Sequence, residues 1–159
     1  MKTAVVYYSL NGNTKYAAEK IAAAMDADLI PLVPIKAYPD SGFKKFFWGG
    51  KSALMGERPK LEPYAFDNGA YDLIVLGSPV WAGTFAPPIR TFVEDNRTAL
   101  AGRPMAAFFC CSGGPGKALD KFKAFCGTEL RQQLILIDPK DRPSSENDGK
   151  IRDFCAALQ

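Results

Sequence analysis

The sequence predicts an α/β fold, in which helices cover both faces of a parallel β-sheet. Five short apolar runs, rich in β-branched and aromatic residues, alternate with segments of helical spacing. The first strand, helix and second strand together span about 30 residues, which is the length of a βαβ unit. The run at residues 71–78 is continuously apolar, as expected for a strand covered on both sides. These observations favour five parallel strands in the order 2-1-3-4-5.

The first three elements form this βαβ unit. The first strand is expected at residues 2–8, and the helix that follows it at about 13–25. The second strand is expected at 27–33. Pro31 has no backbone N–H to donate, which favours an edge position for this strand.

Residues 34–70 interrupt the alternation of strands and helices. The segment contains four prolines, the glycine pair at 49–50 and an aromatic cluster at 43–48. A helix is expected over 42–55, broken or bent at the glycine pair. The aromatic side chains either anchor this long connection to the core or bring Phe47 or Trp48 to a ligand site.

The rest of the chain returns to regular alternation. Strands are expected at 71–78, 104–111 and 131–137, and helices at 86–93, 117–126 and 148–158. Pro87 and Pro88 suit the first turn of a helix, where backbone N–H groups have no intrahelical partner. Residues 1–159 are therefore expected to form a single domain, with the long aromatic and basic connection at about 34–70.

Composition excludes several classes of function. The net charge is only +3, and its lysines and arginines are mostly scattered among acids, so nucleic acid binding is not expected. No apolar run approaches the roughly 20 residues that span a bilayer, and the start lacks signal-peptide features. We therefore expect a cytoplasmic protein without membrane insertion. The chain has four cysteines and no histidine, so we expect no metal site and interpret the cysteines as buried thiols.

Three loops at the carboxyl ends of neighbouring strands form the candidate site. They span residues 9–14, 78–84 and 112–116, and none contains an acidic residue. Ligands of open α/β sheets bind at this edge, where the strand order reverses. In the first loop, hydroxyls, a glycine and the free N–H groups of a helix start can converge on a phosphate dianion. Ordinary helix capping also explains that loop alone, but the convergence of three loops favours a ligand site.

Residue types exclude other phosphate sites of this topology. A phospho-accepting site needs acids where this chain has Ser9 and Ser78, and a Walker loop needs a longer glycine-spaced sequence before its lysine. A Rossmann site needs spaced glycines and an acid after the second strand, and a cysteine phosphatase needs cysteine and arginine in the first loop. What remains is a phosphate in the first loop and a flat ring between the other two, on which Trp81 can stack. FMN fits this description.

The loop sequences resemble those of the flavodoxin family, and the resemblance extends over nearly the whole chain. It is carried by YYSLNGNT at 7–14, GSPVWAGTFAPPI at 77–89 and CSGG at 111–114. The resemblance implies a flavodoxin-like three-layer sandwich with noncovalently bound FMN. It assigns the phosphate to Ser9, Asn11, Gly12, Asn13 and Thr14, and the flavin ring to Pro79, Val80, Trp81, Ala82, Gly83, Ser112, Gly113 and Gly114.

Two departures from the family bear on function. Electron-carrier flavodoxins are usually strongly acidic, whereas this chain is mildly basic. The third loop also lacks the tyrosine that commonly stacks on the outer face of the flavin. Either Phe47 or Trp48 replaces that tyrosine, or the face is open to a substrate.

Three functions therefore remain open. The first is electron transfer to a redox partner protein or a small-molecule acceptor, with no catalytic side chain. The second is an NAD(P)H-dependent reductase of a quinone or similar acceptor, in which Lys44, Lys45, Lys51 and Arg58 meet a nucleotide phosphate. The third is a non-enzymatic interaction module that docks through residues 43–48.

Overall fold

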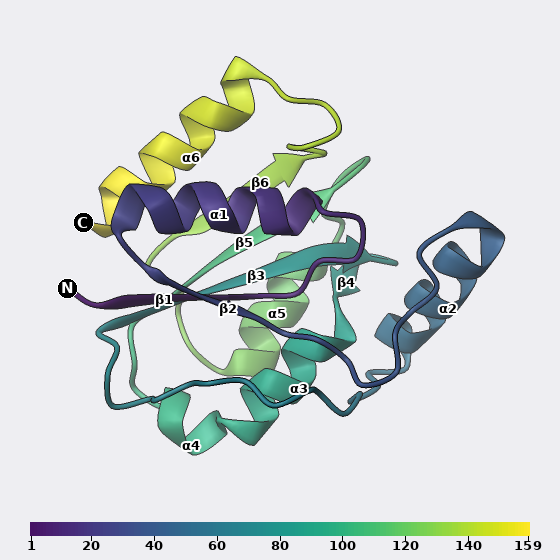
Figure 1. Cartoon of the computed structure of the whole chain (residues 1–159), viewed down its shortest axis with the longest axis horizontal. Coiled ribbons are helices and arrows are strands. Elements are labelled where there is room, and N and C mark those ends of the chain that lie inside the picture. The colour runs from purple at the N-terminus through teal and green to yellow at the C-terminus, as the bar shows by residue number, and fades with distance from the viewer.

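The computed structural model describes residues 1–41 and 48–159 in full, and residues 42–47 only by their place in helix α2. Its parallel strands follow the predicted order, β2-β1-β3-β5-β6, which confirms the expected sheet (Figure 1). Strand β2 lies at an edge, in agreement with its proline. The parallel strands are β1 (Thr3–Tyr7), β2 (Asp28–Pro31), β3 (Leu73–Trp81), β5 (Met105–Cys111) and β6 (Gln133–Ile137).

Helices cover both faces of the sheet, as predicted for a three-layer sandwich. Helices α1 (Asn13–Met25) and α6 (Ser145–Leu158) lie on one face, and α3 (Pro87–Asp95), α4 (Arg97–Leu100) and α5 (Ala118–Cys126) lie on the other (Figure 1). Alternate residues of a strand point to opposite faces. Val5 and Tyr7 therefore pack toward α1 and α6, while Ala4 and Val6 join the core beneath α3 and α5.

A glycine sets the packing between the two central strands. Gly77 of β3 is paired with Phe108 of β5 in the sheet. A Cβ atom on Gly77 would lie 2.1 Å from Cζ of Phe108, closer than any real contact. The absence of a side chain at Gly77 therefore makes room for the fully buried ring of Phe108.

The structure corrects the prediction of a loop at 78–84. Strand β3 continues to Trp81 and pairs antiparallel with a short strand, β4 (Thr84–Phe85). The two residues between them, Ala82 and Gly83, both have positive φ angles, of 50° and 69°. Two-residue turns of this kind match the twist of the strands that they join. The second loop is thus a β-hairpin.

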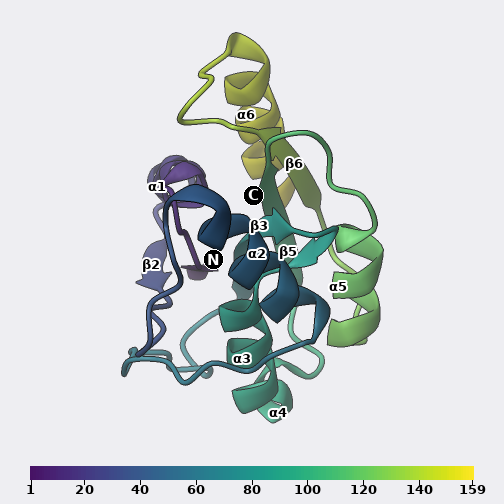
Figure 2. The same cartoon turned by 90° about the vertical axis from the view of Figure 1, so that its right-hand side faces the viewer.

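Helix α2 (Gly42–Leu54) lies beyond the carboxyl ends of the strands, beside β3 and β4 (Figure 2). Of the expected break or bend at the glycine pair, the break is wrong, because the helix is continuous through Gly49 and Gly50. A Cβ atom on Gly49 would lie 3.3 Å from Cε3 of Trp81, so this glycine permits close approach of the helix to the indole. The predictions for Phe43, Phe46 and Phe47 fall outside the described residues.

Two further elements differ from prediction. The short helix α4 was not expected, and α6 begins at Ser145 rather than at residue 148. The hydroxyl of Ser144 accepts the N–H of Asn147 at 3.1 Å, and this cap starts the helix early. The start of α3 at Pro87 confirms the predicted proline position. No helix among the described residues is both long and apolar enough to cross a bilayer.

Candidate functional site

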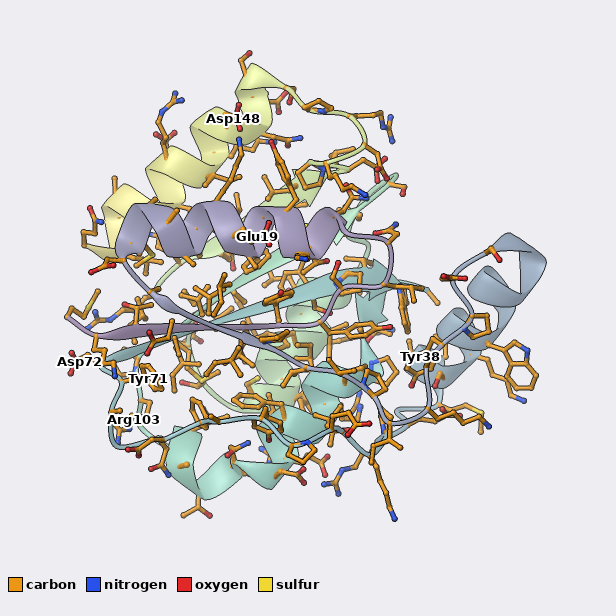
Figure 3. The ribbon with its side chains drawn as sticks, viewed as in Figure 1. Glu19, Tyr38, Tyr71, Asp72, Arg103 and Asp148 are labelled. Carbon is orange, nitrogen blue, oxygen red and sulfur yellow. The ribbon has the colours of Figure 1, made fainter. Side chains whose placement is uncertain are left out.

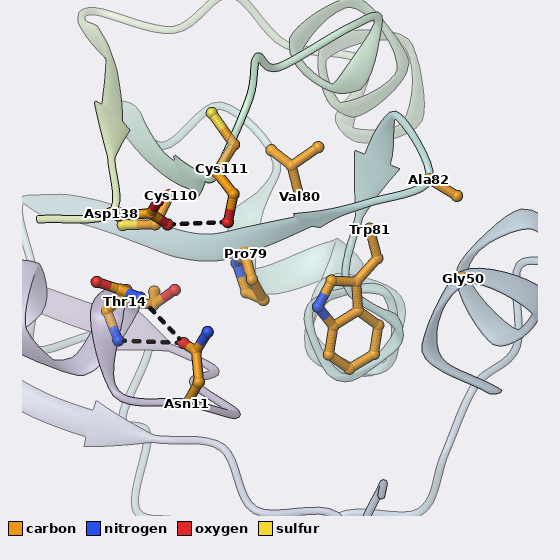
Figure 4. A pocket seen from close by; sticks show the side chains of 12 residues that line it. Asn11, Thr14, Gly50, Pro79, Val80, Trp81, Ala82, Cys110, Cys111 and Asp138 are labelled. Atoms are coloured by element: carbon orange, nitrogen blue, oxygen red, sulfur yellow. Dashed lines mark hydrogen bonds between the residues drawn. The ribbon is translucent and has the colours of Figure 1, made fainter. Parts of the chain in front are cut away.

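A cavity of about 350 Å³ opens at the carboxyl edge of the sheet, where the three predicted loops meet (Figure 4). Its volume lies within the range of small-ligand sites, roughly 300–1,000 Å³. The sequence-predicted residues that line it are Asn11, Asn13, Thr14, Pro79, Val80, Trp81, Ala82 and Ser112. The lining residues that sequence reasoning did not include are Gly50, Cys110, Cys111 and Asp138.

The first loop turns sharply into α1 and exposes donors at the helix start. The hydroxyl of Ser9 accepts the N–H of Gly12 at 3.1 Å, and Gly12 has a φ of 99° that suits glycine. Neither residue lines the cavity, so both shape the turn. The backbone N–H groups of Thr14 and Lys15 form no hydrogen bond with a described residue. The helix start therefore keeps donors for an anion.

Asn13 serves mainly to hold a neighbouring loop. Its side-chain oxygen accepts the backbone N–H groups of Lys140 at 2.9 Å and Asp141 at 3.2 Å. Its side-chain nitrogen donates to the carboxylate of Asp141 at 2.9 Å. The amide of Asn13 thus fastens the loop between β6 and α6 against the start of α1.

This fastening brings a cation to the first loop. The ammonium group of Lys140 donates to the backbone carbonyl of Asn11 at 3.3 Å. It also lies against Gly12, 3.0 Å from the position of a Cβ atom on that residue. Sequence reasoning missed Lys140 because it considered the loops after the first, third and fourth strands only.

Trp81 stands at the opposite end of the cavity, within an aromatic cluster. Its ring meets the edges of Tyr8 and Tyr38 at centroid distances of 5.6 and 5.2 Å, nearly perpendicular in both cases. Gly49 of α2 lies against the indole as well. Burial raises the pKa of both tyrosines above the ordinary tyrosine value.

A buried carboxylate closes the cavity on the side of β6. Asp138 has a φ of 39° and accepts hydrogen bonds from the Ser112 hydroxyl at 2.9 Å and from Nε of Arg142 at 2.9 Å. A guanidinium nitrogen of Arg142 also donates to the Ser112 carbonyl at 2.9 Å. These bonds tie the third loop to the end of β6. The strand-end rule that identified the other loops, applied to the fifth strand, would have found Asp138.

The remaining predicted glycines lie outside the cavity lining. Gly83 belongs to the hairpin turn, and its Cα lies 3.4 Å from the position of a Cβ atom on Gly116, so the second and third loops touch. Gly113 and Gly114 are exposed, with no atom within 4 Å of their Cβ positions. These two glycines leave the rim of the third loop open.

The cysteines of the cavity are not activated. Burial raises the pKa of Cys110 to about 12, although a hydrogen bond with Thr14 acts in the opposite direction. Burial also raises the pKa of Cys111. Both thiols are therefore protonated near pH 7, as the sequence predicted for buried cysteines.

Among the described residues of helix α2, Gly50 is the one that lines this cavity. Trp48 lines a separate cavity on another side of the helix. The alternative in which Trp48 reaches the ligand site is therefore not supported, and Phe47 lies outside the described residues.

The sequence model of the flavodoxin family matches residues 2–137. A search of curated proteins found no match. Among solved structures, the chain is similar to a flavoprotein from Lactobacillus acidophilus in complex with FMN, with 26% identity, a TM-score of 0.76, and coverage of 96% of this chain and 97% of that one.

Two more distant structures share the fold. One is two-electron reduced flavodoxin from Megasphaera elsdenii, with 18% identity, a TM-score of 0.60 and 99% coverage of both chains. The other is a flavodoxin from the domain Archaea, with 16% identity, a TM-score of 0.60, and coverage of 98% of this chain and 94% of that one.

Proposed function

Because this chain belongs to the flavodoxin family, we propose that it is an electron-transfer protein that holds FMN in the cavity at the carboxyl edge of its sheet. FMN is the cofactor, in keeping with the family and with the similar flavoprotein from Lactobacillus acidophilus. The observation that carries the proposal is the polarity of the cavity. Anion donors lie at one end, with the ammonium group of Lys140 beside the first loop, and an aromatic wall lies at the other end.

The first loop and Lys140 suit the phosphate of FMN. The free N–H groups of Thr14 and Lys15 supply hydrogen-bond donors, and the hydroxyl of Thr14 lies in the lining beside them. The ammonium group of Lys140 supplies the opposite charge, and the loop contains no acid to repel a dianion. Ser9, Gly12 and Asn13 support this arrangement by holding the turn and its neighbouring loop.

The hairpin and the third loop suit the ring and the polyol chain. Trp81 offers an apolar face whose orientation is fixed by Tyr8, Tyr38 and Gly49. Pro79, Val80 and Ala82 extend the apolar wall, and the rim at Gly113 and Gly114 gives backbone N–H groups access to a ring edge. Asp138 and Ser112 provide oxygen atoms for hydroxyl groups between the two ends.

The side chains around the cavity favour a carrier over an acid–base enzyme. When bound, FMN supplies reversible uptake and release of electrons. The thiols of Cys110 and Cys111 and the hydroxyl of Tyr8 are not activated as bases or nucleophiles, because burial raises their pKa rather than lowering it. Asp138 is engaged by Ser112 and Arg142. The protein's role is therefore to bind and orient the flavin and to shield it from water.

The reductase alternative has less support. Its support was a basic stretch, Arg58 included, that could meet the phosphate of a nicotinamide nucleotide. Arg58 instead forms ion pairs with Glu94 at 2.7 Å and Asp95 at 3.0 Å. Lys51 lies over the ring of Trp48, away from the cavity, and Lys44 and Lys45 fall outside the described residues.

Anaerobic titration of the FMN-loaded protein distinguishes the two functions. We expect NADPH alone to leave the flavin absorption unchanged over minutes, and dithionite to reduce it in two separate one-electron steps. Rapid bleaching by NADPH without an added reductase would contradict the carrier function and support the reductase.

A further inference from the structure

The segment at 34–70 forms a second surface that the proposed function does not use. Helix α2 and the stretches at 35–39 and 57–60 enclose a cavity of about 710 Å³. Ile35, Tyr38 and Trp48 give this cavity apolar walls. Lys36 and Lys60 also line it. Figure 3 shows Tyr38 beside α2, at the base of this region.

Large apolar side chains on this surface are open to water. Trp48 is 48% exposed and Ile35 is 59% exposed. Leu54 and Met55, at the end of the same helix, are 64% and 68% exposed. Exposed apolar residues as large as Trp48 and Ile35, which line the same cavity, are typical of interaction sites, because their burial against a partner is favourable.

The charges around these residues are mainly positive. No carboxylate of a described residue forms an ion pair with Lys36, Lys51 or Lys60. Lys51 lies over the indole of Trp48, with its Nζ 5.2 Å from the ring centroid. Among the described residues of the cavity lining, Glu57 is the one with a carboxylate, and it accepts a hydrogen bond from Ser52. An acidic partner surface would complement this distribution.

The surface is directly joined to the wall of the FMN cavity. Tyr38 lines the second cavity, and its ring packs against Trp81 of the first at 5.2 Å. Trp48 precedes Gly49, whose backbone lies against the same indole. A protein docked on Trp48 is therefore separated from the flavin site by one layer of aromatic side chains and the α2 backbone.

We propose that the surface formed by Ile35, Lys36, Trp48, Lys51 and Lys60, here called the Trp48 surface, docks an acidic electron-transfer protein. The inference rests on the proposed function, because the docked partner receives one electron from the reduced flavin. The bound flavin is oxidised by one electron in that step, and the partner's redox centre is reduced by one. Opposite charge steers the encounter, and Trp48 and Ile35 supply apolar contact.

Stopped-flow kinetics with two redox proteins of opposite charge test the inference. The FMN-loaded protein is reduced with dithionite, freed of excess reductant, and mixed with oxidised rubredoxin, which is acidic, or oxidised cytochrome c, which is basic. The variants are Lys36→Glu/Lys60→Glu and, as a control of equal charge change away from this surface, Lys121→Glu/Arg131→Glu. Trp48→Ala removes the apolar contact. FMN affinity is measured for every variant.

At low ionic strength we expect Lys36→Glu/Lys60→Glu to slow electron transfer to rubredoxin about tenfold. The control should slow it far less, and Trp48→Ala should slow it at both low and high salt. If the two double variants slow electron transfer equally, net charge explains the effect. The docking proposal for the Trp48 surface is then overturned, whereas the proposed electron-transfer function is not. Absence of transfer to either acceptor overturns the proposed function as well.

Discussion

The ammonium group of Lys140 lies against Gly12, 3.0 Å from the position of a Cβ atom on that glycine. The two residues are 128 positions apart in the chain and are brought together by the bonds between Asn13 and the loop that follows β6. The contact places a positive charge at the loop that we assign to the FMN phosphate. It gives this loop a counter-charge that its own residues do not provide.

Replacing Lys140 should therefore weaken FMN binding through its phosphate. For Lys140→Gln we expect an FMN dissociation constant about tenfold higher, which corresponds to roughly 1.4 kcal/mol. Binding of riboflavin, which has no phosphate, should be unchanged. Flavin fluorescence titrations of both ligands give the comparison, with Lys121→Gln as control. An equal loss for FMN and riboflavin would contradict a role in phosphate binding.

Thr14→Ala should act at the same end of the cavity. The variant removes a hydroxyl beside the free N–H groups of the helix start, and a hydrogen bond to a charged group contributes roughly 1.5–3 kcal/mol. We expect FMN affinity to fall at least tenfold and riboflavin affinity to change little. The same titrations measure both. Unchanged FMN affinity would show that the phosphate lies elsewhere.

Trp81→Ala should weaken both flavins, because the indole faces the ring that they share. Loss of stacking costs roughly 0.5–1.5 kcal/mol beyond the buried area. Quenching of flavin fluorescence in the bound state should also decrease. Trp48→Ala is the matched control, since that tryptophan lines the other cavity. If the two variants have the same effect on affinity and quenching, Trp81 is not part of the flavin site.

Gly77→Ala should destabilise the fold itself. The added methyl group would collide with the buried ring of Phe108, and overpacking of a core typically costs about 1–3 kcal/mol. Urea unfolding followed by circular dichroism measures the change in the free energy of unfolding. Gly113→Ala, at an open position, should have little effect. Equal stability of both variants would contradict the tight packing of β3 against β5.

The buried thiols predict a loss of stability at alkaline pH. Burial raises the pKa of Cys110 and Cys126 to about 12, from an ordinary value of 9.0. Above pH 9.0 the unfolded chain releases protons that the folded chain retains, so the free energy of unfolding falls as pH rises. We expect a lower urea midpoint at about pH 10 than at about pH 8, and a smaller difference in Cys110→Ala. A urea midpoint that does not depend on pH over this interval would contradict the raised pKa of the buried thiols.

The order of strands and helices could be predicted because alternating apolar runs and helical spacing are local properties. The hairpin at 82–83 could not, since Ala82 adopts a positive φ that is unusual for alanine and carries no sequence signal. The continuous helix α2 was missed for a related reason. Glycine lowers helix propensity, but packing of Gly49 against Trp81 outweighs that preference.

For the site, sequence patterns identified the residues that follow the first, third and fourth strands. Asp138 and Lys140 were missed because the loop after the fifth strand was not considered, and only the fold shows that Asp138 meets Ser112 and that Lys140 meets Asn11 and Gly12. Asn13 was assigned to the phosphate, yet its side-chain amide is engaged by the loop after β6. Such roles depend on which segments meet in space.

Titration of the flavin-free protein with FMN, followed by visible absorption and calorimetry, tests the central claim most directly. The account predicts one FMN bound per chain, a shift of the flavin bands on binding, and competition between FMN and inorganic phosphate. Trp81→Ala and Lys140→Gln should each lower the affinity. An absorption spectrum identical to that of free FMN, with no heat of binding at any concentration tested, would contradict the assignment of this cavity to FMN.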